Sequence, residues 1–193
     1  MRPAEMETQV RDHLARGDHR EAAAAALRGL GPQVLGYLES LVLDPDDARD
    51  VFQAFAEELW RWLPTWRGEG SLRAWSYRLA WHAAARFQRG AWRRRRERMR
   101  TTLASRIAAS VATESRAGGR RDRLRRLRQA LDPEERTLLV LRLDRELPWE
   151  EVALVLSGDG APLEPAALRK RFERLKGKLA RMARDQGLVD EEG

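Results

Sequence analysis

Apolar residues recur at intervals of three and four along most of the chain, and the clearest case is the segment 46–62. Such spacing places them on one face of an α-helix. Asp44-Pro45-Asp46 precedes the segment, which is an acidic cap with proline near the first turn. The stripe of this helix consists of Ala48, Val51, Phe52, Phe55, Leu59 and Trp62.

The same spacing elsewhere predicts an all-α protein. Breaks are predicted at Gly17-Asp18, where Asp18 can cap the next helix, and at Gly29, Gly31 and Pro32. Further helices are predicted at about 5–16, 18–27, 33–43, 72–89, 124–131, 134–144, 149–156 and 164–184.

The face of the 46–62 helix opposite its apolar stripe carries Asp46, Asp50, Gln53 and Glu57, at intervals of four, three and four. No basic residue interrupts this line, although Arg49 and Arg61 lie to either side. A solvated helix face usually mixes both signs of charge. Spacing alone leaves two interpretations, plain surface or a docking site for a basic partner.

A glycine loop and an aromatic-rich helix follow. Gly68 and Gly70 favour a turn, and Ser71 stands where a helix N-cap belongs. Helical spacing predicts one buried face and one exposed face, with four consecutive arginines at 93–96 beyond them. Exposed aromatics beside arginines suit single-stranded nucleic acid; a core aromatic cluster with a solvated basic end is the alternative. The predicted buried face is Leu72, Trp75, Leu79 and Ala83, and the exposed face is Arg73, Tyr77, Trp81, Ala84 and Gln88.

Charge is concentrated in the middle of the 193-residue chain. The net charge is +7 and the pI about 10.7, which favours an acidic polymer as partner. Residues 86–128 hold 16 arginines against three acidic residues, so the rest of the chain is mildly acidic. Of the 37 basic residues 34 are arginine, which genomic base composition could also produce.

Several classes of protein are excluded or disfavoured by composition. The chain has no cysteine, so disulfides and thiolate metal sites are excluded, which fits a reducing cytoplasm. The three histidines lack zinc-site spacing, and we expect neither metal nor cofactor. No long apolar run or signal core occurs, so we expect a soluble cytoplasmic protein without membrane insertion. No phosphate loop or nucleophile elbow is found, which argues against an enzyme.

The second half of the chain predicts a flexible linker and a small helical domain. Serine, threonine and glycine dilute the helical pattern over 97–120. From residue 121 on, the pattern predicts a helix-turn-helix, because two short helices are followed by a glycine-containing turn at 157–165 and a basic final helix. A generic helical hairpin is the alternative. Arg169, Lys170, Arg171 and Arg174 lie in the first turns of the final helix, the part that enters a major groove.

With these motifs in order, the chain resembles a bacterial RNA polymerase sigma factor of the extracytoplasmic-function (ECF) group of the sigma-70 family. The resemblance covers about residues 16–187. DDARDVFQAFAEELW is similar to the family segment that binds the polymerase clamp, and WRGEGSLRAWSYRLA to the loop and helix that hold the flipped minus-ten base. LDPEERTLLVLRLDRELPWEEVALVL with AALRKRFERLKGKL resembles the domain that reads the minus-thirty-five element.

The resemblance implies a region 2-like domain (1–96), a linker (97–120) and a region 4-like helix-turn-helix domain (121–193). It implies binding to core RNA polymerase and promoter DNA, control by an anti-sigma factor or other regulator, and no catalysis. Asp46, Asp50, Gln53 and Glu57 would bind polymerase. Minus-ten residues would be Arg67, Gly68, Glu69, Gly70, Ser71, Arg73, Tyr77, Trp81 and Arg89, and minus-thirty-five residues Ala166, Arg169, Lys170, Arg171 and Arg174.

Two departures and two alternatives accompany this prediction. Trp81-His82 stands where many relatives have Arg-Asn, and the turn SGDGAPLEP is longer than the tight turn common in the family. A stand-alone helix-turn-helix regulator explains the C-terminal part, but it leaves the acidic and aromatic helices without a role. An RNA-binding or anti-sigma-type interaction protein is the other alternative.

Overall fold

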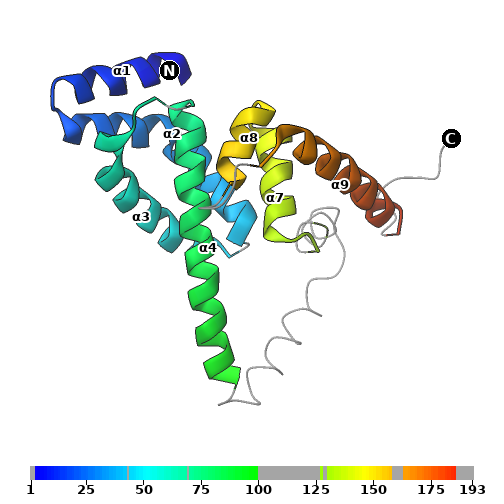
Figure 1. Ribbon diagram of the computed structural model, residues 1–193. Coiled ribbons are helices and arrows are strands. Elements are labelled where there is room, and N and C mark those ends of the chain that lie inside the picture. Colours follow the sequence, from blue (N-terminus) through cyan, green and yellow to red (C-terminus); the bar gives the residue numbers. More distant parts are fainter. Residues whose placement is uncertain are drawn as a thin grey trace.

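The computed structural model describes residues 3–42, 44–68, 70–99, 127, 130–157 and 163–185, with side chains over the same ranges except at residue 3 and residues 91–99. All regular elements in these ranges are helical, which confirms the all-α prediction (Figure 1). The elements are α1 (Pro3–Ala15), α2 (His19–Val42), α3 (Pro45–Trp62), η1 (Leu63–Thr65), α4 (Leu72–Met99), α7 (Pro133–Leu139), η2 (Val140–Asp144), α8 (Trp149–Leu156) and α9 (Pro165–Asp185).

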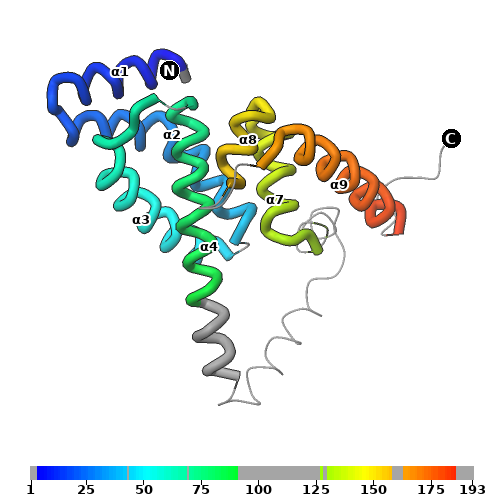
Figure 2. Tube along the Cα trace, in the orientation of Figure 1, coloured from blue at the N-terminus to red at the C-terminus, as the bar shows by residue number. Residues whose placement is uncertain are grey.

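Helices α1 to α4 pack as a bundle around apolar side chains (Figures 1 and 2). One prediction is wrong here, because α2 runs without a break through Gly31 and Pro32. Proline removes one backbone hydrogen bond from a helix interior. Both halves of α2 nevertheless bury one continuous face, and Gly31 lies close enough to α3 that an added Cβ would meet the Phe52 ring at 3.5 Å. The packing of α2 thus outweighs the helix-breaking preference of Gly31 and Pro32.

Helix α3 begins and ends largely as its sequence predicts. Asp44 is the N-cap, and its Oδ1 accepts from the amides of Asp46 and Asp47 at 2.9 and 3.0 Å. The predicted apolar stripe is buried or half-buried except for Trp62, which is 48% exposed. Leu63, in the 3-10 turn that follows, is buried at that end of the helix, so Trp62 is left at the surface.

Helices α7, α8 and α9 form a second group. Asp132 and Glu135 make a reciprocal capping box at the start of α7, with amide-to-carboxylate distances of 2.8 and 3.1 Å. The predicted helix 134–144 corresponds to α7 followed by η2, which is a π-helix. Helix α9 packs on α7 and α8 and points away from α1 to α4 (Figure 1).

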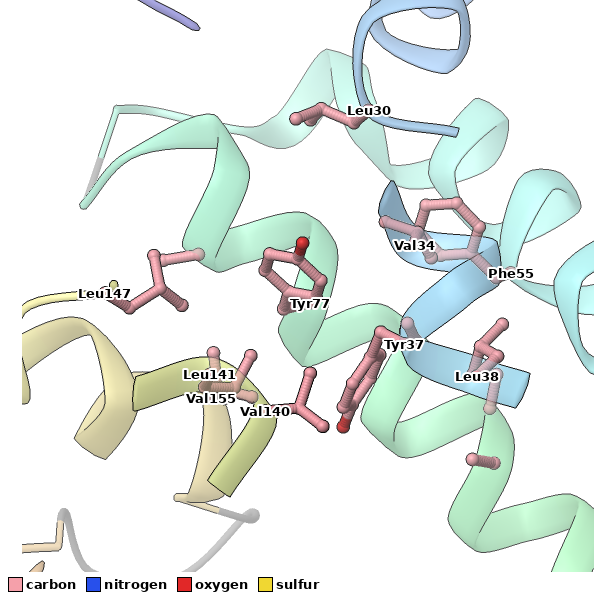
Figure 3. Packing of buried hydrophobic residues seen from close by; sticks show 14 of the residues in the cluster. Leu30, Val34, Tyr37, Leu38, Phe55, Tyr77, Val140, Leu141, Leu147 and Val155 are labelled. Carbon is pink, nitrogen blue, oxygen red and sulfur yellow. The ribbon is translucent and has the colours of Figure 1, made fainter. Parts of the chain in front are cut away.

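The two groups share one buried core. α8 packs on α4, and α7 packs on α2. Figure 3 shows Tyr37 of α2 and Tyr77 of α4 in one cluster with Val140, Leu141 and Leu147. The tyrosine rings pack edge to face with centroids 5.3 Å apart, and the Tyr37 hydroxyl lies 3.1 Å from Oγ1 of Thr137.

Parts of the sequence prediction lie outside the described residues. These are Glu69, linker residues 100–120, most of the helix predicted at 124–131, and turn residues 158–162. Within the described ranges, none of the helices is both long and apolar enough to cross a membrane. The domain boundaries remain a prediction, because α4 extends to Met99 and the structure does not mark where one domain would end.

Candidate nucleic-acid interface

The loop before α4 has the backbone that its glycines predict. Gly68 and Gly70 have φ angles of 80° and 74°, in the left-handed region that side chains disfavour. Gly70 also lies against α8, since an added Cβ would be 3.0 Å from Cδ2 of Leu154. Arg67 is exposed beside the loop. These glycines therefore permit both the turn and the close approach of α8.

The first turn of α4 has two side-chain caps. Oγ of Ser71 accepts from the Ala74 amide at 3.1 Å, as the N-cap prediction requires. The second cap comes from another helix, because Oε2 of Glu7 in α1 accepts from the Leu72 amide at 2.9 Å. Glu7 was not predicted as a site residue, and a single acidic residue far away in sequence gives no pattern from which to find it.

Tyr77 and Ala84 were predicted to be exposed, and this prediction is wrong. Both are buried, with exposures of 0% and 1%. The helical wheel assumed one packed face, but α4 is enclosed by α2 and α3 and also by α8. Leu72 and Ala83 of the predicted stripe are buried, and the buried face extends beyond them to Ser76, Tyr77, Ala80 and Ala84. Burial raises the pKa of the Tyr77 phenol, although the charges of Arg145 and Arg73 oppose part of the shift.

The other predicted residues of α4 differ in exposure. Trp75 and Trp81 are both half-buried, so the predicted contrast between an inner and an outer tryptophan is absent. Trp81 packs against the edge of the core, whereas Arg89 is exposed. Trp81, Gln88 and Arg89 line one groove together with the start of α7. A surface at this end of α4 is therefore accessible, while the Tyr77 end is covered.

The covering segment is held by hydrogen bonds that the sequence did not predict. Arg73 of α4 donates to the Arg145 carbonyl oxygen, and Nη2 of Arg145 donates to the Gln33 carbonyl oxygen of α2 at 3.1 Å. Glu146 has a left-handed φ of 53°, at the turn between η2 and α8. Leu147 follows and is fully buried. Arg73 is thus occupied by the C-terminal group of helices in this arrangement.

Helix α9 presents its predicted residues to solvent. Ala166, Arg169, Lys170, Arg171 and Arg174 are all exposed. Leu168, Phe172 and Leu175 form the buried stripe. Two of the arginines face acidic partners, Arg169 with Glu150 at 3.7 Å and Arg171 with Glu134 at 3.4 Å. Lys170 has no ion-pair partner within the described part of the chain.

The acidic face of α3 is exposed at all four predicted positions, Asp46, Asp50, Gln53 and Glu57. It is not wholly unpaired, because Arg49 reaches back to Asp46, and Nε2 of Gln53 donates to Glu57 at 3.3 Å. Trp60, which is 51% exposed, was not predicted as a site residue. It lines a shallow groove with Gln53, Glu57, Arg61 and Leu27. The acidic line therefore borders an apolar surface.

Comparison with known families identifies the part of the chain that carries these helices. Residues 27–94 match the profile of sigma-70 region 2. This part of the chain is a sigma-70 region 2 domain. The match contains the acidic face of α3, the glycine loop and the aromatic part of α4, and it leaves out α1 and the C-terminal helices. A comparison with curated protein sequences gave no match.

Two solved sigma-factor structures have a similar fold. CnrH in complex with the cytosolic domain of CnrY matches with a TM-score of 0.65 and 19% identity, over 93% of this chain and 98% of that one. The sigma factor RpoE of Bartonella quintana, in complex with the anti-sigma factor NepR, matches with a TM-score of 0.56 and 14% identity, over 82% and 94%. At these identities the likeness concerns the fold, and it extends to the C-terminal helices.

Proposed function

We propose that this chain is a sigma factor of the ECF group, which binds core RNA polymerase and directs promoter recognition and transcription initiation. The observation that carries the proposal is the sigma-70 region 2 match over residues 27–94, within a chain whose whole fold resembles that of sigma factors. The chain has no catalytic role of its own and acts in the cytoplasm. Its proposed division is 1–96, 97–120 and 121–193.

The exposed acidic face of α3 is the proposed polymerase-binding surface. Its carboxylates lie on one side of a rigid helix, next to the groove that Trp60 lines. A rim of charge around exposed apolar side chains suits a protein partner, since charge steers association and buried aromatics contribute affinity. Asp50 is the best single position to test, because it is exposed and has no ion-pair partner in the described ranges.

The loop and α4 are the proposed minus-ten surface, and α9 is the proposed minus-thirty-five reader. On α9, phosphate contacts would supply affinity and base contacts selectivity. On α4, Arg73 donates to the Arg145 carbonyl oxygen and Tyr77 is fully buried in the core shared with the C-terminal helices, so neither side chain can reach DNA in this arrangement. The proposed function therefore requires the C-terminal helices to separate from α4 when polymerase and promoter are bound.

An anti-sigma factor or similar regulator is a proposed further partner. RpoE is solved with the anti-sigma factor NepR, and CnrH with the cytosolic domain of CnrY. These complexes support a search for a regulator of the present chain. They do not identify its chemistry.

The test is run-off transcription with purified core RNA polymerase over a pool of upstream DNA regions. We expect promoter-specific transcripts only when the chain is added. Asp50→Arg should weaken core binding without loss of helicity, whereas Asp12→Arg makes the same charge change on α1 and should bind core as the wild type does. Promoter binding without polymerase, and no effect on transcription by core, would instead identify a stand-alone helix-turn-helix regulator.

A further inference from the structure

Helix α1 lies outside the residues that match sigma-70 region 2, yet it contacts the glycine loop within them. The helix is anchored by Met6 and Val10, whose exposures are 2% and 0%. It packs against α2, so its side chains have fixed positions relative to the bundle. Two of those side chains, Glu7 and Arg11, point at the loop and the start of α4.

Glu7 caps the N-terminus of α4. The first amides of a helix lack partners within the helix, and a carboxylate beside them is favoured by hydrogen bonding and by the helix dipole. Oε2 of Glu7 accepts from the Leu72 amide at 2.9 Å, across 65 positions of sequence. Oε1 of the same carboxylate accepts from Nη2 of Arg11 at 2.8 Å, so both oxygens are engaged.

Arg11 contacts the other end of the loop. Its guanidinium lies 5.1 Å from the centre of the Trp66 ring, within the range of a cation–π contact. Its Nη2 lies so near Gly68 that an added Cβ there would be only 3.2 Å away. Arg11 therefore touches the residue before Arg67 and the residue after it. Together the two α1 side chains contact the segment 66–72 at both ends.

The same two side chains line the cleft that holds the start of the proposed minus-ten surface. Glu7 and Arg11 border it together with Ser71 and Arg73. The opposite wall comes from the C-terminal helices, with Leu147, Pro148 and Glu151. When that wall moves away, α1 remains as the fixed support of the loop, because its anchors Met6 and Val10 lie within the N-terminal bundle.

We propose that Glu7 and Arg11 are positioning residues for promoter melting, a role that rests on the proposed function. They hold the loop with its two left-handed glycines in the conformation that receives the flipped base. A pocket for an extracted base must be shaped in advance, since base extraction is unfavourable and ordering a loose loop would add to that cost. Neither residue needs to touch DNA for this role.

The experiment compares Glu7→Ala and Glu7→Gln with Asp12→Ala, which removes an exposed carboxylate from the same helix. Each full-length variant is assayed by amide hydrogen exchange over residues 68–74 and by thermal unfolding. Each is then combined with core polymerase for core affinity and for permanganate reactivity of the bubble, at a promoter obtained with the wild type. Glutamine keeps an oxygen that can accept from the Leu72 amide, whereas alanine does not.

For Glu7→Ala we expect faster exchange at the Leu72 amide and about fivefold less open complex, the effect expected from one lost capping hydrogen bond. Core affinity should be unchanged. Glu7→Gln should recover most of both losses, and Asp12→Ala should match the wild type. A purely structural role would instead lower thermal stability and core affinity together with the open complex.

Two failures are distinguishable. If the wild type opens promoters and Glu7→Ala opens them equally well, the positioning role is wrong while the sigma-factor function stands. If the wild type opens no promoter with core polymerase, the proposed function itself is wrong, and the positioning role fails with it.

Discussion

Helices α4 and α9 are the two helices that we propose to contact DNA, and they differ in how far the fold covers them. On α4, Tyr77 is fully buried and Arg73 donates to a carbonyl of the C-terminal group. On α9, Arg169 and Arg171 have side chains that are 56% and 47% exposed. One surface must be uncovered before it can bind a base, and the other is accessible without any rearrangement.

The difference follows from the number of neighbours each helix has. Helix α9 packs on one side, mainly through Leu168, Phe172 and Leu175, so its opposite face is exposed. Helix α4 has neighbours on more than one side, and its small and aromatic residues pack against the helices on these sides. A side chain can therefore belong to a core in one arrangement and to a binding surface in another.

The largest expected effect is the loss of stability in Tyr77→Ala. Truncation of a fully buried aromatic ring should lower the free energy of unfolding by about 3–5 kcal/mol, measured by denaturant titration. Tyr77→Phe is the control, and it should stay within about 1 kcal/mol of the wild type, because it keeps the buried ring and removes only the hydroxyl. A cost below about 1 kcal/mol for Tyr77→Ala would mean that the C-terminal helices do not pack on this ring in solution.

High pH should expose the buried region around Tyr77. Burial is the main cause that raises the pKa of both Tyr37 and Tyr77, the only two tyrosines. Their contribution to stability is complete below the unfolded-state pKa of about 10 and is lost as pH rises from there toward the folded-state values. Tyrosinate absorbance should therefore appear only with loss of the α2–α7 and α4–α8 contacts.

The double variant Tyr37→Phe with Tyr77→Phe is the matched control for this alkaline transition. It should keep more of its stability above pH 10 than the wild type, because no phenol remains to ionise. If the wild-type tyrosines instead titrate near pH 10 while near-ultraviolet dichroism stays native, the two rings are exposed and the covered surface does not exist.

Substitutions on the exposed face of α9 should change DNA recognition without changing the stability of the fold. Lys170 and Arg174 lie farthest from the buried stripe, so alanine at either position should leave the unfolding free energy within about 0.5 kcal/mol. A base contact would cost roughly 1–3 kcal/mol at one position of the minus-thirty-five element, measured by competition binding of the polymerase holoenzyme. Arg181→Ala, on the same face and about three turns beyond Lys170, is the control and should keep full specificity.

Sequence reasoning succeeded where structure depends on near neighbours. The caps by Asp44 and Ser71 are confirmed, since each depends on residues within three positions. It failed where distant segments meet. The continuity of helix α2 through Pro32 depends on its packing against α3. The burial of Tyr77 depends on residues some 70 positions later in the chain. The pattern of α4 alone contains nothing that specifies a neighbour on its second side.

For the candidate site, the sequence identified the loop and the exposed faces of α3 and α9. It could not identify Glu7, Arg11 or Arg145, because each acts through long-range contacts that leave no periodicity in the sequence. The roles assigned to the site residues remain predictions.

The smallest expected effect concerns the ion pair between Arg171 and Glu134. Both side chains are largely exposed, so the pair should stabilise the fold by less than about 1 kcal/mol, and Glu134→Gln should unfold almost as the wild type does. Its influence on DNA binding should be clearer, because Glu134 both occupies Arg171 and repels phosphate. If Arg171 binds a phosphate, Glu134→Gln should raise affinity for all sequences alike, and Arg171→Ala should reduce the salt slope of binding by about one. Equal salt slopes for Arg171→Ala and the wild type would place Arg171 away from the phosphates. The accessible surface of α9 would then be limited to the side of Lys170 and Arg174.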